Sequence, residues 1–195
     1  MRGGELADFS AVELMRDGRH VTIRAIRPAD RGLVIDGLRN VGPDSLYLRF
    51  FSKKSRFTDE ELTRATAVDF ADVVALVAVV EQAGGERIVG GGRYLRIDAS
   101  GPRQRAEVAF LIDDAHQGLG IGSHLFNHLV AIARAAGIVQ FEAEVLPANQ
   151  GMLRLFSRSG LPVTKTVTPE AVHLAIDLTA GGPASDGARL PGRRG

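Results

Sequence analysis

The chain has 195 residues, a formal net charge of +1 at neutral pH and no cysteine. This length suits one domain with a core large enough to fold alone, and the balanced charge gives no electrostatic argument for a nucleic-acid partner. The lack of cysteine excludes disulfides, thiolate catalysis and cysteine-rich metal sites. No apolar run approaches the roughly 18 residues of a membrane span and no signal peptide is recognisable, so we expect no membrane partner and a cytoplasmic location.

The first 18 residues are read as a polar leader. Within it, Ser10 and Glu13 have the spacing of a capping box, which predicts a helical turn over residues 10–15. Residues 20–27 alternate in polarity and predict the first strand. Pro28 ends that strand, and Asp30 is placed to cap the helix that follows.

The middle of the chain predicts two helices and then a run of strands. A helical pattern covers residues 44–51, and another helix begins after Thr58, which forms a capping box with Glu61. Residues 73–80 are almost continuously apolar and predict a strand buried on both faces. A Gly84-Gly85 turn leads to a strand at residues 88–97, and a hairpin loop over 98–105 leads to the strand that holds Glu107.

The most informative segment is His116-Gln117-Gly118-Leu119-Gly120-Ile121-Gly122-Ser123, between a predicted strand and a predicted helix. Three glycines in five residues leave the backbone free of Cβ atoms, so several N–H groups can turn toward one anion at the positive end of the helix. We interpret the segment as a pyrophosphate cradle. The N–H groups expected to contact the anion are those of Gln117, Gly118, Gly120, Gly122 and Ser123.

A glycine-rich loop alone is a weak signal for a particular phosphate-binding motif, because P-loops and dinucleotide-binding motifs are also rich in glycine. A P-loop requires a lysine before the closing Ser or Thr, and Gly122 stands there, which argues against kinase or ATPase chemistry. A dinucleotide fingerprint requires glycine where Ser123 stands, although Glu142 lies about where a ribose-binding acid would. This reading stays open, as does a glycine-softened helix start without a ligand.

The rest of the chain predicts a mixed sheet with helices on its faces. A strand over residues 139–146 leads through Pro147 and Ala148 to Asn149 and a second helical pattern, and the last strands cover 163–167 and 171–178. Residues 180–195 are rich in glycine and proline and predict a disordered tail. The expected division is therefore a leader at 1–18, a domain at 19–179 and a tail at 180–195.

The order of strand, glycine loop, helix, strand, asparagine and helix resembles the GNAT acetyltransferase superfamily. Its acetyl-CoA motif, Q/R-x-x-G-x-G/A, is matched by Gln117, Gly120 and Gly122. Residues 46–51 and 106–110 are similar, more particularly, to bacterial protein-lysine acetyltransferases that act on acyl-CoA synthetases. The resemblance implies an α/β GNAT fold: a mixed, mostly antiparallel central sheet with helices on both faces and a splayed strand pair at the acetyl-CoA site. It implies acetyl-CoA as cosubstrate and no metal.

Amide formation requires a base, because an alkylammonium with a pKa near 10 must lose its proton before its nitrogen can attack. Glu107 is the best candidate, since it lies on the strand that leads to the glycine loop. In the lysine acetyltransferases that the chain resembles, the matching glutamate is the general base. Glu142 and Glu144 on the next strand are the fallback bases.

The resemblance also assigns roles around the thioester. It implies that the main chain around Phe110 and Leu111 contacts the acetyl and pantetheine groups and stabilises the oxyanion. It places Asn149 near the pantetheine arm, whereas a helix N-cap is the alternative role for that residue. Many GNAT enzymes have a tyrosine seven residues after the asparagine, where it protonates the leaving thiolate. Phe156 stands at that position here, so the usual general acid is missing.

Three other side chains admit two readings each. Tyr47 lies where the family builds its acceptor wall, but a helical tyrosine beside Phe50 also suits core packing. His124 and His128 are one helical turn apart and could chelate a metal, but the sequence supplies no convincing third ligand, so we read them as residues of the helix face.

We therefore expect an N-acetyltransferase that moves an acetyl group from acetyl-CoA directly to a primary amine. A protein lysine is the favoured acceptor, with an acyl-CoA synthetase as the candidate protein. The alternatives are a small-molecule amine acetyltransferase and a non-catalytic acyl-CoA-binding module. A homodimer stays open as a further partnership.

Overall fold

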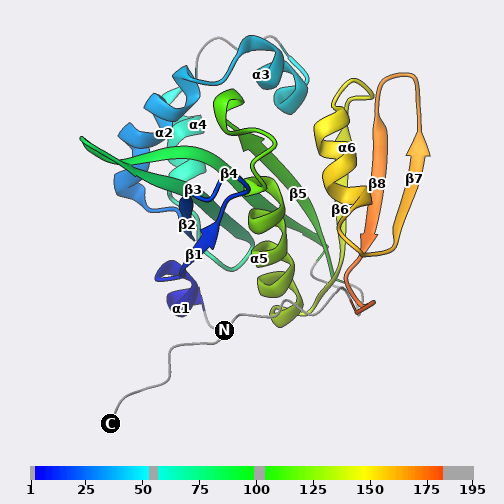
Figure 1. Ribbon diagram of the computed structural model, residues 1–195. Coiled ribbons are helices and arrows are strands. Elements are labelled where there is room, and N and C mark those ends of the chain that lie inside the picture. Colours follow the sequence, from blue (N-terminus) through cyan, green and yellow to red (C-terminus); the bar gives the residue numbers. More distant parts are fainter. Residues whose placement is uncertain (1–2, 53–56, 99–103, 182–195) are drawn as a thin grey trace.

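The computed structural model describes residues 3–52, 57–98 and 104–181. The helices and strands of these residues follow one another along the chain and are labelled in Figure 1. In order they are α1 (Gly3–Ala7), β1 (Ser10–Leu14), β2 (His20–Ala25), α2 (Arg31–Arg39), α3 (Pro43–Phe50), α4 (Asp59–Thr66), β3 (Val73–Gln82), β4 (Gly85–Asp98), β5 (Gln104–Ile112), α5 (Ile121–Ala135), β6 (Ile138–Val145), α6 (Gln150–Ser157), β7 (Val163–Val167) and β8 (Val172–Asp177).

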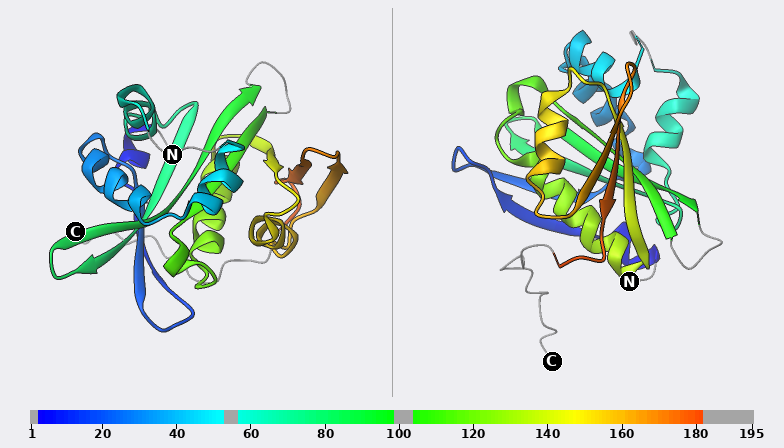
Figure 2. Two further views of the ribbon diagram at one scale, coloured as in Figure 1. Left: turned by 90° about the horizontal axis from the view of Figure 1, so that it is seen from above. Right: turned by 90° about the vertical axis from the view of Figure 1, so that its right-hand side faces the viewer.

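One eight-stranded sheet organises these elements, with the strand order β1-β2-β3-β4-β5-β6-β8-β7. Neighbouring strands are antiparallel except for β5 and β6, which are parallel. Helices α2 and α4 pack on one face of the sheet, and α5 and α6 pack on the other (Figures 1 and 2). The mixed, mostly antiparallel sheet with helices on both faces is confirmed.

Strand β3 is buried on both faces, as its apolar run predicts. Val74, Leu76 and Ala78 belong to the larger core, which α5 covers. Val77 and Val79 belong to a smaller core, against which Leu33 and Val34 of α2 pack. The two-sided core explains why this strand has no polar alternation.

The capping box at Thr58 is also confirmed. The Thr58 hydroxyl accepts a hydrogen bond from the Glu61 backbone N–H at 3.2 Å, and the Glu61 carboxylate accepts one from the Thr58 N–H at 2.9 Å. These two bonds satisfy donors that the first turn of a helix leaves without partners, so α4 begins where its local sequence places it.

The helical turn expected at residues 10–15 is wrong, because Ser10–Leu14 forms β1. This strand pairs antiparallel with β2, from Ser10 opposite Arg24 to Leu14 opposite His20. The backbone of β2 offers a full ladder of hydrogen bonds, and this long-range pairing outweighs a local cap. A segment read as a leader therefore contributes an edge strand, whereas the domain boundaries themselves stay a prediction.

A buried ion pair joins β2 to the start of α2. Arg24 and Asp30 are 2% and 4% exposed and form two hydrogen bonds, of 2.7 and 2.9 Å, while Arg24 also donates to Glu86 at 2.7 Å. Burial alone raises the pKa of Asp30, but the hydrogen bonds from Arg24 and from the Arg27 N–H outweigh it and hold that pKa below its ordinary value. The carboxylate precedes α2 without bonding to its N–H groups, so it anchors the helix rather than capping it.

Strands β5 and β6 separate partway along their length. They are paired only from Gln104 to Glu107 on β5 and from Ile138 to Glu142 on β6. Beyond Glu107, the edge of β5 that faces β6 has no strand partner, which gives the splayed pair that the resemblance implies. The gap opens toward the glycine loop (Figure 1).

Two predictions lie outside the described residues. They are most of the hairpin loop at 99–103 and the tail at 182–195. Within the described ranges, no helix combines the length and the apolar character needed to cross a membrane.

Candidate functional site

The glycine loop leads directly into α5, and two of its glycines have backbone conformations that other residues adopt only with strain. Gly118 and Gly120 have φ angles of +77° and +95°, and Gly120 is the N-cap residue of α5. These left-handed conformations turn the chain sharply before the helix, so that the N–H groups of its first turn face outward at the positive end of the helix dipole. The loop has the backbone geometry of an anion cradle.

The hairpin formed by β1 and β2 contacts this loop from one side. The Arg16 backbone N–H donates to the Leu119 carbonyl at 3.0 Å, and the Arg16 guanidinium donates to the Gly118 carbonyl at 3.1 Å. These contacts use carbonyl oxygens and leave the loop N–H groups free to face an anion. Two predicted donors are exceptions. The Gln117 N–H donates to the Asp114 carbonyl at 3.4 Å, and the Ser123 N–H donates to the Gly120 carbonyl at 3.0 Å.

Gln117 ties the loop to neighbouring elements through its side chain. Its amide donates to the Asp114 carboxylate at 3.0 Å, to the Ser45 hydroxyl of α3 at 3.2 Å and to the Ile112 carbonyl at 3.3 Å. The Asp114 carboxylate in turn accepts from Ser45 at 2.6 Å and from the Gly42 N–H at 3.0 Å. The side chain of Gln117 therefore fixes the position of α3 beside the loop.

A cavity of about 520 Å³ runs along the loop and the gap between β5 and α6. We call it the cofactor cavity. It brings together all of the residues that the sequence assigns to the cofactor: Phe110, Leu111, Gln117, Gly118, Gly120, Gly122, Ser123 and Asn149.

Four arginines also line the cofactor cavity, and sequence reasoning missed them. They are Arg16 from the first hairpin, Arg49 from α3, and Arg154 and Arg158 from the region of α6. Arg154 and Arg158 are four residues apart, but Arg16 and Arg49 lie far from them in a sequence of balanced charge, so no local cluster indicates the whole set. Their shared position gives the cavity a positive character that suits a ligand with several phosphates.

Asn149 is an N-cap residue of α6. Its side-chain oxygen accepts a hydrogen bond from the Met152 N–H at 3.1 Å. This bond is the capping role that the sequence leaves as an alternative. Because Asn149 also lines the cofactor cavity, it fixes the start of α6 at the cavity wall.

A smaller cavity, of about 240 Å³, lies between the separated strands β5 and β6. We call it the strand-gap cavity. Glu107 and Glu144 line it, and so does the ring of Phe156. It shares with the cofactor cavity the lining residues Leu48, Arg49, Phe110, Asn149 and Met152. The two cavities are therefore adjacent, and the glycine loop lines one of them while Glu107 lines the other.

Phe156 is fixed by aromatic packing rather than by a polar partner. It is 1% exposed, and its ring centroid lies 5.6 Å from that of Phe126 and 6.2 Å from that of Phe110. This packing joins α6 to α5 and to β5 at the point where β5 leaves β6. The position that carries an acid in many GNAT enzymes is here part of the core.

The three acidic candidates for the base have different surroundings. Glu142 forms an ion pair with Arg105 at 2.7 Å and also accepts a hydrogen bond from Gln140 at 3.2 Å. Among the residues that the structure describes, Glu107 and Glu144 have no hydrogen bond or ion pair, and both are exposed. Glu142 is therefore engaged, whereas Glu107 is free to accept a proton.

Arg49 is an electrostatic partner of Glu107. Burial and then the positive charge of Arg93 lower the pKa of Arg49, the negative charge of Glu107 raises it, and the net result is a pKa of about 10. Arg49 therefore remains a cation at neutral pH and lies close enough to Glu107 for the two charges to interact.

The remaining candidates are placed as follows. Tyr47 is 43% exposed, so it is not a core residue. His124 and His128 both face Glu13 of β1, at 3.2 and 2.7 Å. No group of three or more metal-binding side chains occurs in residues 3–52, 57–98 and 104–181. The two histidines instead join α5 to the first hairpin.

Comparison with known proteins agrees with this geometry. Residues 44–161 match the model of the "Acetyltransferase (GNAT) family". An acetyltransferase of Pseudomonas aeruginosa is 33% identical over 141 residues, which are 72% of this chain and 74% of the relative. The acetyltransferase Pat of Mycolicibacterium smegmatis is 31% identical over 146 residues, or 75% of this chain, and the match spans 42% of Pat.

The fold likeness extends to solved structures. The crystal structure of the GNAT domain of S. lividans PAT superimposes with a TM-score of 0.77 and is 38% identical, covering 86% of this chain and 96% of that domain. The family model covers more than half of the chain, and it includes the glycine loop, the separated strands and α6. The sequence match and the shared architecture lead to the same conclusion: this protein belongs to the GNAT acetyltransferase family.

Proposed function

We propose that this acetyltransferase moves the acetyl group of acetyl-CoA directly to the ε-amine of a protein lysine, with Glu107 as the general base. The observation that carries the proposal is that the cofactor cavity and the strand-gap cavity are adjacent and share five lining residues. A cofactor held by the glycine loop at one end would place its thioester toward Glu107 at the other.

The chain's own groups fit the cosubstrate of the family. GNAT acetyltransferases use acetyl-CoA, which supplies an activated thioester. The N–H groups near Gly118 and Gly120, at the N-terminus of α5, suit its pyrophosphate. Arg16, Arg154 and Arg158 add positive charge along the same wall. We propose that Gly122 also offers its N–H to the pyrophosphate, and that Phe110, Leu111 and Asn149 line the path of the pantetheine arm.

The proposed reaction is a direct transfer. Glu107 accepts a proton from the lysine ammonium, either directly or through water, and thereby frees the nitrogen lone pair. The amine then attacks the acetyl carbon, which forms the C–N bond and a tetrahedral oxyanion. This intermediate collapses as the C–S bond breaks, the CoA thiolate leaves, and the second proton of the nitrogen passes to water or to the thiolate. Backbone N–H groups around Phe110 and Leu111 stabilise the oxyanion, because β5 lacks a strand partner on its β6 side there.

The leaving thiolate does not depend on a tyrosine in this scheme. A thiol has a pKa near 8.5, so its anion is a tolerable leaving group and water can protonate it. Phe156 borders the strand-gap cavity and keeps its floor apolar. We therefore propose that the enzyme works without a side-chain acid at this position.

Protein lysine is the proposed acceptor because of the relatives. The likeness to Pat and to the PAT domain supports it, as does the resemblance of residues 46–51 and 106–110 to protein-lysine acetyltransferases. An acyl-CoA synthetase is the proposed acceptor protein. The cytoplasmic location, a homodimer and the boundaries 1–18, 19–179 and 180–195 stay predictions.

The test uses the purified full chain with acetyl-CoA and either an acyl-CoA synthetase or a panel of small amines. Release of the CoA thiol is followed in solution, and acetyl-lysine in the synthetase is located by mass spectrometry. Release that depends on the synthetase, together with a modified lysine, is the expected result. Turnover with small amines alone would instead assign a small-molecule acceptor, and CoA binding without turnover on any acceptor would favour a binding module.

A further inference from the structure

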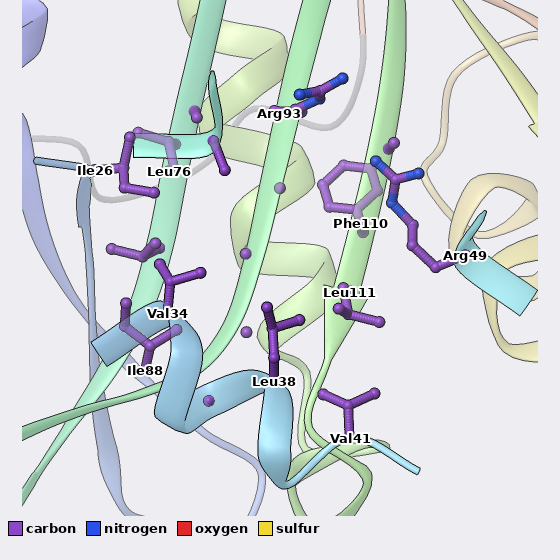
Figure 3. Close-up of a pocket in the computed structure, with 18 of the residues that line it drawn as sticks. Ile26, Val34, Leu38, Val41, Arg49, Leu76, Ile88, Arg93, Phe110 and Leu111 are labelled. Atoms are coloured by element: carbon purple, nitrogen blue, oxygen red, sulfur yellow. The ribbon is translucent and has the colours of Figure 1, made fainter. Parts of the chain in front are cut away.

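A third cavity, of about 430 Å³, lies on the sheet face that α2 and α4 cover. We call it the apolar cavity. Figure 3 shows its lining, with Val34 and Leu38 from α2 on one side and Ile88 and Leu111 from the sheet on the other. The proposed reaction does not use this space. A cavity of this volume can hold an apolar side chain together with the backbone atoms next to it.

The floor of the apolar cavity is open because β4 has a glycine there. Gly91 lies opposite Leu111 in the β4–β5 register and opposite Val77 in the β3–β4 register. A Cβ atom at Gly91 would have only ordinary contacts, 3.4 Å from the Leu76 carbonyl and 4.0 Å from a Val77 methyl. A side chain could therefore stand at this position, and its absence is what leaves the cavity unfilled.

The apolar cavity lies on the same sheet face as Glu107. Arg93 is paired with Ala109, and the next pair on that face is Leu95 with Glu107. Side chains two residues apart on a strand share a face, so Arg93 and Glu107 are diagonal neighbours. An acceptor whose amine reaches Glu107 therefore has the apolar cavity beside it.

Two arginines stand at the end of the cavity nearest Glu107. Arg49 from α3 and Arg93 from β4 both line it, and Figure 3 shows them near the Phe110 ring. Across residues 3–52, 57–98 and 104–181, neither guanidinium forms a hydrogen bond or an ion pair, although Arg49 lies over the Phe50 ring at 5.0 Å. The two like charges repel each other, and the negative charge of Glu107 offsets part of that of Arg49. A further anion between the two guanidiniums would be stabilised by both.

The acidic residues that line the cavity do not supply this anion. The Glu61 carboxylate accepts the Thr58 N–H at 2.9 Å in the capping box, and Asp113 is paired with Arg87. The positive charge of Arg49 and Arg93 is thus available to a ligand. A carboxylate is the group in an acceptor protein that a guanidinium binds with the best geometry.

We propose that Arg49 and Arg93 bind an acidic side chain next to the target lysine of the acceptor protein, while a neighbouring apolar side chain enters the apolar cavity. This inference rests on the proposed function and deepens it, because it names the sequence context of the lysine. Charge complementarity selects the acidic residue, and the cavity lining selects the apolar one. Arg49 and Arg93 are specificity residues in this scheme, and Glu107 carries the chemistry.

The test uses lysine peptides in matched sets. The parent peptide has an aspartate and a leucine flanking the lysine, a second has asparagine in place of the aspartate, and a third has serine in place of the leucine. Initial rates of CoA release give kcat/KM, and fluorescence anisotropy of labelled peptides on the CoA-saturated enzyme gives binding. We expect kcat/KM to be about tenfold or more higher for the parent than for the asparagine peptide.

Three variants separate the two parts of the proposal. Arg93→Gln should remove most of the preference for aspartate without changing the affinity for CoA. Gly91→Val should fill the cavity and remove the preference for leucine, while leaving the preference for aspartate. Arg39→Gln is the control, because that exposed arginine pairs with Asp36 on α2 and does not line the apolar cavity, and it should change neither preference.

The outcomes distinguish this inference from the proposed function. Equal rates and equal binding for all peptides would overturn the inference and leave lysine acetylation standing. Acetylation of free amino acids but of no peptide would overturn both. If neither peptides nor free amino acids are acetylated, the anisotropy decides: binding that needs the aspartate and is lost in Arg93→Gln supports the inference, and binding without that dependence overturns it.

Discussion

Glu107 of β5 lies directly opposite Glu142 of β6 at the last paired position before the two strands separate. Two carboxylates that face each other would repel, but Arg105 pairs with Glu142 at 2.7 Å and neutralises it. Among the described residues, the Glu107 carboxylate at the mouth of the strand gap therefore has no hydrogen bond or ion pair, although the charge of Arg49 acts on it. The end of the ladder places a free carboxylate beside an unpaired strand edge, which are the two groups that acyl transfer to an amine requires.

The backbone geometry of the glycine loop predicts different effects for alanine substitutions at Gly120 and at Gly122. Gly120→Ala forces a methyl group into a left-handed conformation, at a cost of about 1–2 kcal/mol. We expect a higher KM for acetyl-CoA and a lower Tm. Gly122→Ala should leave the KM for acetyl-CoA and the Tm near their original values, because its Cβ would have only ordinary contacts with Leu155, at 3.7 Å.

Steady-state kinetics and thermal unfolding of the two variants check this prediction. A KM that rises equally in both would contradict the importance of the backbone turn at Gly120. It would indicate instead that any added methyl group obstructs the cofactor.

A second pair of glycines, in β4, tests packing under the site. A Cβ atom at Gly92 would lie 2.5 Å from the Phe110 ring, whereas one at Gly91 would be 3.4 Å from its nearest neighbour. Overpacking of this kind costs about 1–3 kcal/mol, so Gly92→Ala should lower the free energy of unfolding by that amount. Gly91→Ala should be neutral or stabilising. Urea unfolding of both variants decides, and equal stabilities would show that Phe110 moves aside freely.

The buried Arg24–Asp30 pair predicts that the free energy of unfolding decreases at acid pH. The folded state holds the pKa of Asp30 below its ordinary value, so its stabilising contribution is fully present above about pH 4. That contribution is lost as the pH falls through the lower, folded value. Asp30→Asn leaves Arg24 buried with a weaker partner, and we expect a loss of about 3–5 kcal/mol at neutral pH.

Urea unfolding at pH 7 and at pH 3 measures this effect. Asp30→Asn should lose less stability between the two pH values than the unmodified chain does. The control is Asp36→Asn, since the exposed Asp36–Arg39 pair contributes less than about 1 kcal/mol. A similar small loss in both variants would refute the structural role of the buried pair.

Local signals predict most of the fold. The capping box at Thr58, the apolar run of β3 and the glycines before α5 each depend on residues close together in the sequence. Such signals fail where a distant partner decides the structure. Ser10 has a capping box of the same pattern as Thr58, but the free edge of β2 pairs with its segment and makes a strand instead.

The candidate site also has a part that the local sequence predicts and a part that depends on residues far apart in the sequence. The motif predicts the cofactor residues from Gln117 to Ser123, and the structure gathers them with Phe110, Leu111 and Asn149 around one cavity. It could not predict Arg49 and Arg93, because they meet near Glu107 only through the β4–β5 register and the position of α3. Acceptor recognition depends on such long-range placement, whereas a cofactor loop is local.

The most direct test of the account measures kcat of Glu107→Gln with a protein-lysine acceptor between pH 7 and pH 10. Loss of a general base should lower kcat by about 100-fold or more at pH 7, with KM for acetyl-CoA unchanged. The deficit should shrink toward pH 10, where the lysine amine, with a pKa near 10.4, loses its proton to solvent.

Glu144→Gln serves as the matched variant, because Glu144 is the other carboxylate without a partner in the strand-gap cavity. The account predicts a far smaller change for it. A Glu107→Gln enzyme that turns over at the original rate at pH 7, or a loss that appears only in Glu144→Gln, would contradict the assignment of Glu107 as the base.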